Sequence, residues 1–553
     1  MNWSVEILGC IPVNAQRILF AGDSTDALAG LKKAFAQRNP QANWTVWLAQ
    51  SPDLASGTAK DFDVILLDFQ WLVLDAMGRS RLYELDLFFK PADDLEQSAD
   101  RTQTVICFYQ NAYAWSALNA RLSGKFHNDP MAQVAREFVL SWLQSKRFEP
   151  LKLHRLFREE NQSAFESWLE SMQSHFQQLG VSITEAKERH CHEIEIIRAR
   201  RSKGSVQRRT RLVVAMLAMA PDFADVRTKL PLASIQTHAD VDVIYMERKG
   251  NIPNVSIDQP KVLIVQRQLP DSERSWQETV NRLHQKAWAV VAEWDDHPDL
   301  FAPSVRSNFD KFPWGSVRLA DAVQTSTQRL ADAIRKVRQH GEPNDLCTPC
   351  EDVRVFDNRL LDLPQQRPRE IRMRNLKDQS GQIMIFFGAL NRTAEGLALM
   401  RAINPVLKRF DQISITVLHD RQVFEAVDTP RKRFIQRLSY VDYHQCLAQC
   451  DIALLPLESH FANQCKSDIK WVECAANQVA CITSPTVYGD SIEDGLTGLI
   501  ADGYDAFAEH LERLIRNPEL ILDLAERARA KIAAERMLAQ TVDARISWYE
   551  RVW

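Results

Sequence analysis

The sequence predicts an α/β protein with three Rossmann-like domains, the last two forming a pair. Length is the first reason: at 553 residues the chain exceeds what one hydrophobic core supports, which favours several domains. Patterning is the second, because short apolar runs alternate with amphipathic helical stretches in three separate blocks. Such alternation is typical of parallel sheets covered by helices.

The first block occupies residues 1–150 and is followed by a different segment at 151–210. Strands are expected at QRILFAG, WTVWLAQ, DFDVILLDF and TQTVICFYQN, with a helix at DALAGLKKAFAQ. Residues 151–210 are charged and helical in pattern, and they end in a basic stretch that runs from Arg198 to Arg211. We expect a helical, basic linker there, whose cations either face solvent or contact an anionic lipid surface.

Two further blocks occupy residues 211–365 and 366–535. The second block offers the strands RLVVAMLAM, DVDVIYMER, KVLIVQRQL, AWAVVAEWDD and VRLADAVQTS, and the third offers QIMIFFGAL, ISITVLHD, FIQRLSYV, DIALLPL and VACITSP. Residues 536–553 are expected to form a C-terminal helix that crosses back to the second block. Ligands collect at the carboxyl ends of parallel strands, so a binding cleft is expected between these two blocks.

Composition excludes several classes of protein. A formal net charge of -4 gives no sign of a nucleic-acid partner. The longest apolar run, residues 212–220, is far shorter than the roughly 20 residues of a membrane-spanning helix. The first residues lack the pattern of a secretory signal, and the 10 cysteines show no regular spacing, which favours reduced thiols in a cytoplasmic protein.

Two motifs have the spacing of metal ligands. Cys347 and Cys350 form a C-x-x-C pair, to which His190, Cys191 and His192 could add ligands. Four ligands must converge tetrahedrally, and nothing in the sequence ties these segments together, so we expect no metal there.

The second motif, Asp240-Val241-Asp242, matches the D-x-D pattern of metal-dependent sugar transferases. Because it opens an apolar strand directly, we interpret it as the edge of a strand.

The segment 451–501 carries the most chemical information. A strand leads through a polar loop into a helix expected from about Ser467 to Ala476. Lys466, Lys470 and Glu473 are spaced i, i+4 and i+7, which places them on one stripe of that helix. A helix start stabilises phosphate, and a carboxylate further on can accept hydrogen bonds from ribose hydroxyls. The stripe therefore suits a nucleoside diphosphate, although such a face can equally be a solvated, salt-bridged surface.

This segment also resembles the donor-binding part of GT-B glycosyltransferases of the family 4, or group 1, type. The positions that match the family's succession of residues are Pro456, Leu457, Asn463, Lys466, Ser467, Lys470, Glu473, Ala475, Ala476, Ser484, Tyr488, Ile492, Asp494, Gly495, Gly498 and Leu499. The likeness extends over about residues 211–553, through FFGALNR and RLSYVDYHQCLAQCDIALLPL as well as VRTKLPL and VVAEWDDHPDL.

The resemblance implies transfer of a sugar from a nucleotide sugar without a metal or other cofactor, helped by electrostatic stabilisation of the leaving diphosphate. It implies that Glu473 holds the ribose and that Lys466, Lys470 and Arg392 hold the diphosphate. The implied donor site as a whole is Gly388, Arg392, Tyr443, Asn463, Lys466, Ser467, Lys470 and Glu473.

On the acceptor side, the resemblance implies catalytic roles for Arg227, Asp295 and Asp296. The two aspartates could instead be a helix N-cap or a strand-end turn. One position departs from the family: the second glutamate, eight positions before Glu473, is Cys465 here. A catalytically silent assembly subunit is therefore an alternative.

The first block resembles Rossmann-like S-adenosylmethionine methyltransferases, through QRILFAGDSTDALAGLKKAF, DFDVILLDFQWL and NAYAWSALNARLSGKF. Its first turn keeps only Gly22 and then Gly30, and WTVWLAQ does not end in an acidic residue. We therefore expect a degenerate domain that does not bind S-adenosylmethionine and serves as a scaffold or in oligomerisation; an active methyltransferase or a bifunctional enzyme is the alternative.

The hypothesis for the whole chain is a hexosyltransferase-type enzyme of polysaccharide biosynthesis or protein glycosylation. Its acceptor is expected to be a glycan, a lipid-linked saccharide or a protein. A cytoplasmic location is expected, with possible peripheral contact to the inner face of the membrane.

Overall fold

The computed structural model describes most of the chain, in two compact units: Met1–Arg209 with Gln236–Val241, and Thr210–Ile235 with Asp242–Trp553. The described residues are 3–22, 25–47, 62–68, 103–110, 139–140, 142–143, 148–156, 162–178, 182–184, 186, 194–201, 211–218, 225–238, 240–246, 252–339, 353–377, 382–388 and 392–553. They form three six-stranded sheets, which confirms the predicted α/β class. Within the described residues no helix is long and apolar enough to cross a membrane.

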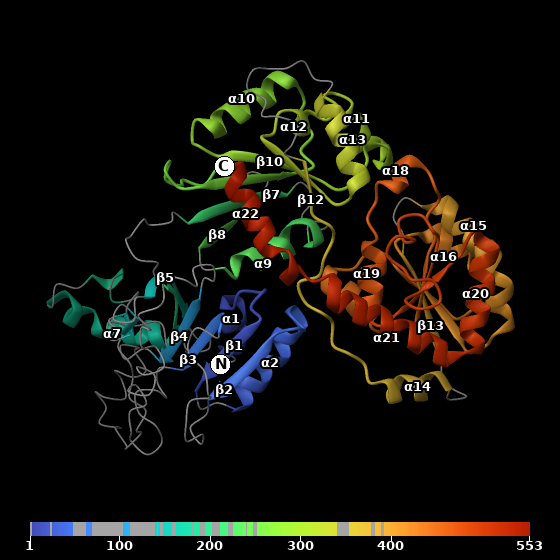
Figure 1. The fold of residues 1–553 in the computed structure, drawn as a ribbon, viewed down its shortest axis with the longest axis horizontal. Coiled ribbons are helices and arrows are strands. Elements are labelled where there is room, and N and C mark those ends of the chain that lie inside the picture. Colours follow the sequence, from blue (N-terminus) through green and yellow to red (C-terminus); the bar gives the residue numbers. More distant parts are fainter. Residues whose placement is uncertain are drawn as a thin grey trace, which may run out of the picture. The chain divides into compact units, whose positions relative to one another are not determined.

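The first unit contains a mixed sheet with strand order β2-β1-β3-β4-β6-β5 (Figure 1). Its strands are β1 (Arg17–Ala21), β2 (Asn43–Trp47), β3 (Val64–Asp68), β4 (Thr104–Gln110), β5 (Phe148–Leu156) and β6 (Ile194–Arg201), and its helices include α1 (Trp3–Cys10), α2 (Thr25–Arg38) and α7 (Gln162–Gln178). The first four strands pair in parallel, whereas β6 pairs antiparallel with both β4 and β5.

Residues 151–210 are more than the linker expected from the sequence. Besides helix α7, they contribute strand β6 and most of β5 to the first sheet. Arg198, expected in a solvated basic stretch, is buried in β6 and donates to the carbonyl oxygens of Gln236 (3.3 Å) and Thr237. The charges of IEIIRARR hid a strand whose isoleucines favour the pleated conformation. Residues 203–209 of the basic stretch lie outside the described residues.

The second sheet has the order β12-β11-β10-β9-β7-β8. Its strands are β7 (Leu212–Ala218), β8 (Val241–Met246), β9 (Lys261–Gln266), β10 (Ala289–Trp294), β11 (Ala322–Thr325) and β12 (Val353–Val355). Its helices are α9 (Leu230–Gln236), α10 (Glu273–His284), α11 (Pro303–Phe309), α12 (Gly315–Arg318) and α13 (Gln328–Gln339), with a π-helical turn at Asp225–Lys229 and a 3₁₀ turn at Pro298–Leu300. The pairs from β7 through β9, β10 and β11 to β12 are all parallel.

The D-x-D motif lies at the start of β8, which confirms its interpretation as a strand edge. Asp240 pairs with Arg200 at 3.2 Å, and Asp242 pairs with Arg211 at 3.5 Å. The C-x-x-C motif and the segment from His190 to His192 lie outside the described residues.

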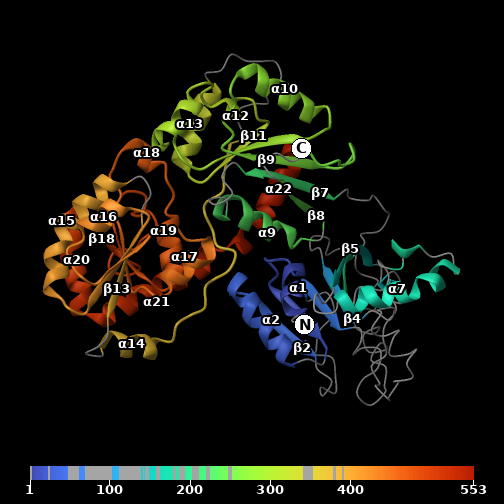
Figure 2. The same ribbon diagram turned by 180° about the vertical axis from the view of Figure 1, so that it is seen from behind.

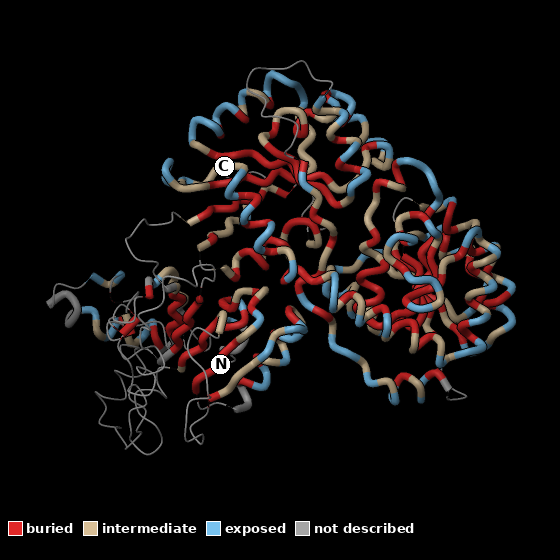
Figure 3. Tube along the Cα trace, in the orientation of Figure 1, coloured by how far each residue is buried: buried red, intermediate tan, exposed pale blue. Residues whose placement is uncertain are grey.

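The third sheet is parallel throughout, with the order β15-β14-β13-β16-β17-β18. Its strands are β13 (Ile383–Gly388), β14 (Ile413–Leu418), β15 (Lys432–Ile435), β16 (Ile452–Leu455), β17 (Ala480–Thr483) and β18 (Leu499–Ile500). The helices of this part are α14 (Arg369–Lys377), α15 (Thr393–Arg409), α16 (Arg421–Ala426), α17 (Tyr440–Leu447), α18 (Phe461–Gln464), α19 (Ile469–Ala476), α20 (Tyr504–Arg516) and α21 (Pro518–Glu535). Figure 3 shows its strands buried and the outer faces of its helices exposed.

The segment FIQRLSYV, expected as a strand, is a strand only at its first two residues. Ser439 then caps helix α17 by accepting a hydrogen bond from the Asp442 backbone N–H at 3.1 Å. A serine in this position favours a helix start over the continuation of the strand.

After a short 3₁₀ turn (Leu538–Gln540), the last helix, α22 (Val542–Val552), lies against the second sheet (Figures 1 and 2). The Tyr549 hydroxyl donates to Gln324 Oε1 of β11 at 2.7 Å. The Trp548 ring meets Phe356 edge-on, with 5.4 Å between ring centroids. The two sheets of the second unit are therefore connected by a helix at the end of the chain as well as by the segment between β12 and α14.

Candidate functional site

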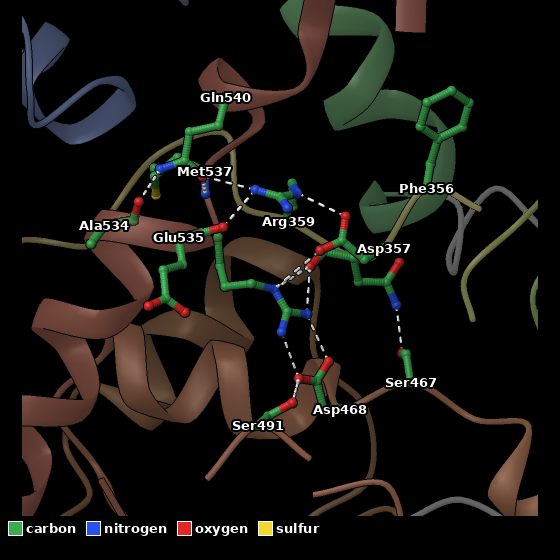
Figure 4. A network of polar contacts seen from close by, with 12 residues as sticks. Phe356, Asp357, Arg359, Ser467, Asp468, Ser491, Ala534, Glu535, Met537 and Gln540 are labelled. Atoms are coloured by element: carbon green, nitrogen blue, oxygen red, sulfur yellow. Dashed lines mark hydrogen bonds and ion pairs between the residues drawn. The ribbon is translucent and has the colours of Figure 1, made fainter. Parts of the chain in front are cut away.

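Helix α19 begins two residues later than the sequence suggested, at Ile469, with Asp468 as its N-cap. Asp468 is fixed outside the helix because its carboxylate binds Arg536 at 2.6 and 2.7 Å and accepts from the Ser491 hydroxyl at 2.6 Å (Figure 4). Lys466 and Ser467 therefore lie in the turn between α18 and α19. Only Lys470 and Glu473 belong to the helix itself.

A polar network ties this turn to the segment after β12 (Figure 4). Arg536 also donates to the carbonyl oxygen of Asn358 at 2.9 Å, and the Asn358 side chain donates to the Ser467 hydroxyl at 2.6 Å. The beginning of α19 is thus positioned by contacts from both sides.

Lys466 contacts residues that follow two strands of the second sheet. Its ammonium pairs with Asp296 at 3.3 Å, and Asp296 also pairs with Arg267 at 2.7 Å, while Arg267 binds Asp295 through Nε. Burial raises the pKa of Asp296, but the Lys466 ammonium and the Arg267 guanidinium together lower it below its ordinary value. The N-cap interpretation of the two aspartates is wrong, because their carboxylates bind cations and His297 caps the following turn.

Lys470 and Gly388 meet at the carboxyl end of β13. The Lys470 ammonium donates to the Gly388 carbonyl oxygen. Burial, with help from the neighbouring Arg392 and Lys466 charges, lowers the pKa of Lys470 well below its ordinary value. A Cβ on Gly388 would lie 2.7 Å from the Phe386 ring, so the absence of a side chain is a packing requirement here.

Glu473 is buried one turn further along α19. Burial raises its pKa to about 7, although the Tyr443 and Tyr440 hydroxyls and the Lys470 charge favour the ionised form. Tyr443 lies on α17, and its ring meets Phe386 of β13 with 6.0 Å between centroids. A buried carboxylate with tyrosine neighbours is suited to bind hydroxyl groups.

Lys466, Lys470 and Glu473 thus converge at the carboxyl edge of the third sheet, facing the carboxyl edge of the second. Residues 399–546, which include all three, match the family model described as "Glycosyl transferase-like". The chain is a GT-B glycosyltransferase of the group 1 type.

Several solved structures are similar to this glycosyltransferase. HepE from Anabaena, crystallised with UDP and glucose, is 14% identical, with 61% of this chain and 98% of that chain covered and a TM-score of 0.42. A glycosyltransferase from Rickettsia africae is 10% identical, with coverage of 62% and 98% and a TM-score of 0.41. TarM from S. aureus, with UDP and two glycan ligands, is 11% identical, with coverage of 52% and 55% and a TM-score of 0.38. No curated protein matches the chain.

A second group of polar residues of the glycosyltransferase lies where β13 and β16 end. Arg392, the N-cap of α15, donates to the Pro456 carbonyl oxygen at 2.9 Å. The buried Asn463 side chain donates to Glu458 O at 3.0 Å and to Glu395 Oε1 at 3.3 Å. Glu395 was not predicted as a site residue. Its acidic place in the first turn of a helix was visible, but its burial was not.

Arg227 of the glycosyltransferase is engaged by its own protein. It is 4% exposed and binds both carboxylate oxygens of Glu293 in β10, at 2.7 and 3.2 Å. It also donates to the Phe356 carbonyl oxygen at 2.6 Å and to Asn358 Oδ1 at 2.8 Å. These contacts join the π-helical turn, β10 and the segment after β12. Its catalytic role stays a prediction, and the contacts described indicate a positioning residue.

Cys465 stands at the family's second glutamate position, and its side chain is buried. It packs within the apolar cluster of the second sheet, whose other members include Trp294 and Phe309. Its carbonyl oxygen accepts from the Thr327 hydroxyl at 2.8 Å. Burial raises the pKa of the thiol above its ordinary value, so the group is a neutral packing residue.

Proposed function

We propose that this glycosyltransferase takes a nucleoside diphosphate sugar as its donor and binds it along the start of α19. The observation that carries the proposal is the convergence of two lysines, an arginine and a buried glutamate at the carboxyl end of β13. In this proposal Lys466, Lys470 and Arg392 hold the diphosphate beside Gly388, and Glu473 accepts hydrogen bonds from the ribose hydroxyls. Tyr443 supports Glu473, while Ser467 and Asn463 shape the loop.

We propose that side-chain cations, and no divalent metal, balance the charge of the leaving diphosphate. The donated bond breaks between the anomeric carbon and the phosphate oxygen, so negative charge grows on the diphosphate. Lys466 and Lys470 lie where that charge develops, and preorganised cations stabilise a transition state more than a ground state in which the charge is smaller. Transfer that continues undiminished in excess EDTA supports this; loss of transfer restored by Mg²⁺ or Mn²⁺ contradicts it.

Binding of the donor diphosphate is tested by thermal unfolding with UDP, GDP and ADP. A ligand at 100 times its Kd stabilises the folded state by about 2.7 kcal/mol, so at least one diphosphate should raise the Tm measurably. Glu473→Ala should abolish the increase. The matched control is Glu493→Ala, a carboxylate of the same domain that pairs with Lys531 at 2.7 Å and belongs to no proposed contact. A Tm indifferent to all three ligands would sink the proposal.

For the acceptor we propose a glycan, a lipid-linked saccharide or a protein, with Asp295 and Asp296 on the acceptor side. A donor-hydrolysis assay with a panel of nucleotide sugars separates an enzyme from a silent subunit, because transferases slowly transfer sugar to water. A peripheral membrane contact is tested by co-sedimentation with vesicles containing anionic lipid.

A further inference from the structure

Four charged side chains form a closed group between the second and third sheets. Arg267 binds Asp295 and Asp296, and Asp296 is shared with Lys466. Two positive and two negative charges leave the group neutral. Lys466, proposed above as a diphosphate ligand, is therefore already neutralised by a carboxylate of the same chain.

We infer that Asp296 is an internal counter-ion of Lys466, which the donor diphosphate displaces, so that the Asp296 carboxylate becomes free for the acceptor once the donor is bound. The inference rests on the proposed function, because it assigns Lys466 to the diphosphate. It adds an order of events: the donor binds first and prepares the acceptor side.

The contact has the properties of an exchangeable ion pair. The side chains of Lys466 and Asp296 are 23% and 28% exposed, so a ligand can reach both. Their single N–O contact of 3.3 Å is longer than the 2.7 Å contact between Asp296 and Arg267. Partly exposed pairs of this kind contribute about 0.2 to 1 kcal/mol. A diphosphate offers more charge and more acceptor oxygens than one carboxylate, so it competes successfully for the ammonium.

The exchange requires only a movement of the lysine side chain. Its neighbours are held by residues of the second sheet's domain: Cys465 O accepts from Thr327 at 2.8 Å, and Ser467 Oγ accepts from Asn358 at 2.6 Å. The backbone at Lys466 is therefore fixed on both sides. The lysine stem is flexible, and its ammonium can reorient from one acceptor to another without domain movement.

Release of Lys466 leaves Asp296 with one cation. Oδ2 keeps its contact with Arg267, whereas Oδ1 loses its partner. The freed oxygen can accept a hydrogen bond from an acceptor hydroxyl. Before the donor binds, the same oxygen is occupied by Lys466, so the acceptor contact depends on the donor.

The test is isothermal titration with UDP, GDP and ADP on the full chain. Asp296→Asn removes the competitor for Lys466, so we expect it to tighten binding of the preferred diphosphate by about two- to fivefold. Lys466→Met should weaken binding. In the Lys466→Met background, Asp296→Asn should have no further effect, because the exchange has lost its cation.

Asp295→Asn is the matched control, since it removes the same charge one residue away and its carboxylate contacts Arg267 only among these cations. It should leave diphosphate affinity within about the range of measurement. Equal tightening by both asparagine variants would show a general charge effect and overturn the inference, as would unchanged or weaker binding by Asp296→Asn. If none of the three diphosphates binds the wild type, the proposed function itself fails.

Donor hydrolysis gives a second readout, with water as the acceptor. Asp296→Asn should bind the diphosphate more tightly and yet hydrolyse the nucleotide sugar more slowly, because the amide accepts the hydrogen bond less well than the carboxylate. Faster hydrolysis together with tighter binding would contradict the acceptor role of Asp296.

Discussion

Two pairs of opposite charge connect parts of the second unit, and they are built differently. Arg227 and Glu293 are 4% and 0% exposed, bind through two contacts, and have their other polar atoms taken up by Phe356, Asn358 and Gln324. Lys466 and Asp296 are about a quarter exposed and share a single contact. The first pair resembles a structural rivet, since removal of either partner leaves a buried charge; the second can be broken and remade during a reaction cycle.

The largest expected effect concerns the buried pair. Arg227→Ala leaves the Glu293 carboxylate buried without its cation, so we expect it to lower the free energy of unfolding by about 3 to 5 kcal/mol. Urea denaturation followed by circular dichroism measures this. The control is Arg306→Ala, because Arg306 pairs with Asp299 and Asp310 at a side-chain exposure of 40% and should cost less than about 1 kcal/mol. Similar losses for the two variants would remove the distinction between the pairs.

A double replacement sharpens the same point. Arg227→Met with Glu293→Leu removes both charges and leaves apolar groups of similar volume. Its loss of stability should be smaller than that of Arg227→Ala alone, since replacing a buried pair is often neutral while breaking it is not. A double variant less stable than the single one would indicate that the hydrogen bonds to Phe356 and Asn358 matter more than the charges.

Glu473 provides an intermediate effect through pH. Its pKa of about 7 in the folded protein exceeds the ordinary value of 4.5, so the folded state holds a proton that the unfolded chain releases. This contribution is present below about pH 4.5 and is lost as the pH rises to about 7, amounting to about 3 kcal/mol over that window. Unfolding measured at pH 5 and pH 7.5 should show this extra fall in the wild type and not in Glu473→Gln. Parallel pH profiles would contradict the raised pKa.

The smallest expected effect concerns the exposed pair. Lys466→Met should lower the free energy of unfolding by less than about 1 kcal/mol, and the difference should shrink further in 1 M salt, where the Debye length is about 3 Å. Chemical denaturation at two salt concentrations measures it. A loss above about 2 kcal/mol that salt does not reduce would place Lys466 with Arg227 as a structural cation.

The sequence by itself determined the local features of this protein. Alternating apolar and amphipathic segments predicted the strands of all three sheets except β5 and β6, which were hidden by charged residues such as Arg198 and Glu195. The spacing of Lys466, Lys470 and Glu473 identified the stretch in which the site lies, because side chains three and four residues apart share a helical face. The departure at Cys465 was also visible without coordinates.

Only the tertiary structure decided which distant residues meet. The pairing of Lys466 with Asp296 spans 170 positions, and that of Arg227 with Glu293 spans 66. No local pattern encodes such partners, because they are set by the order of strands in a sheet and by how two sheets are joined. The same reason explains Glu395: its sequence shows a charge in the first turn of a helix, and only packing against Asn463 and Glu458 buries it. Burial and long-range pairing give these carboxylates and cations their chemistry, and both are properties of the folded chain.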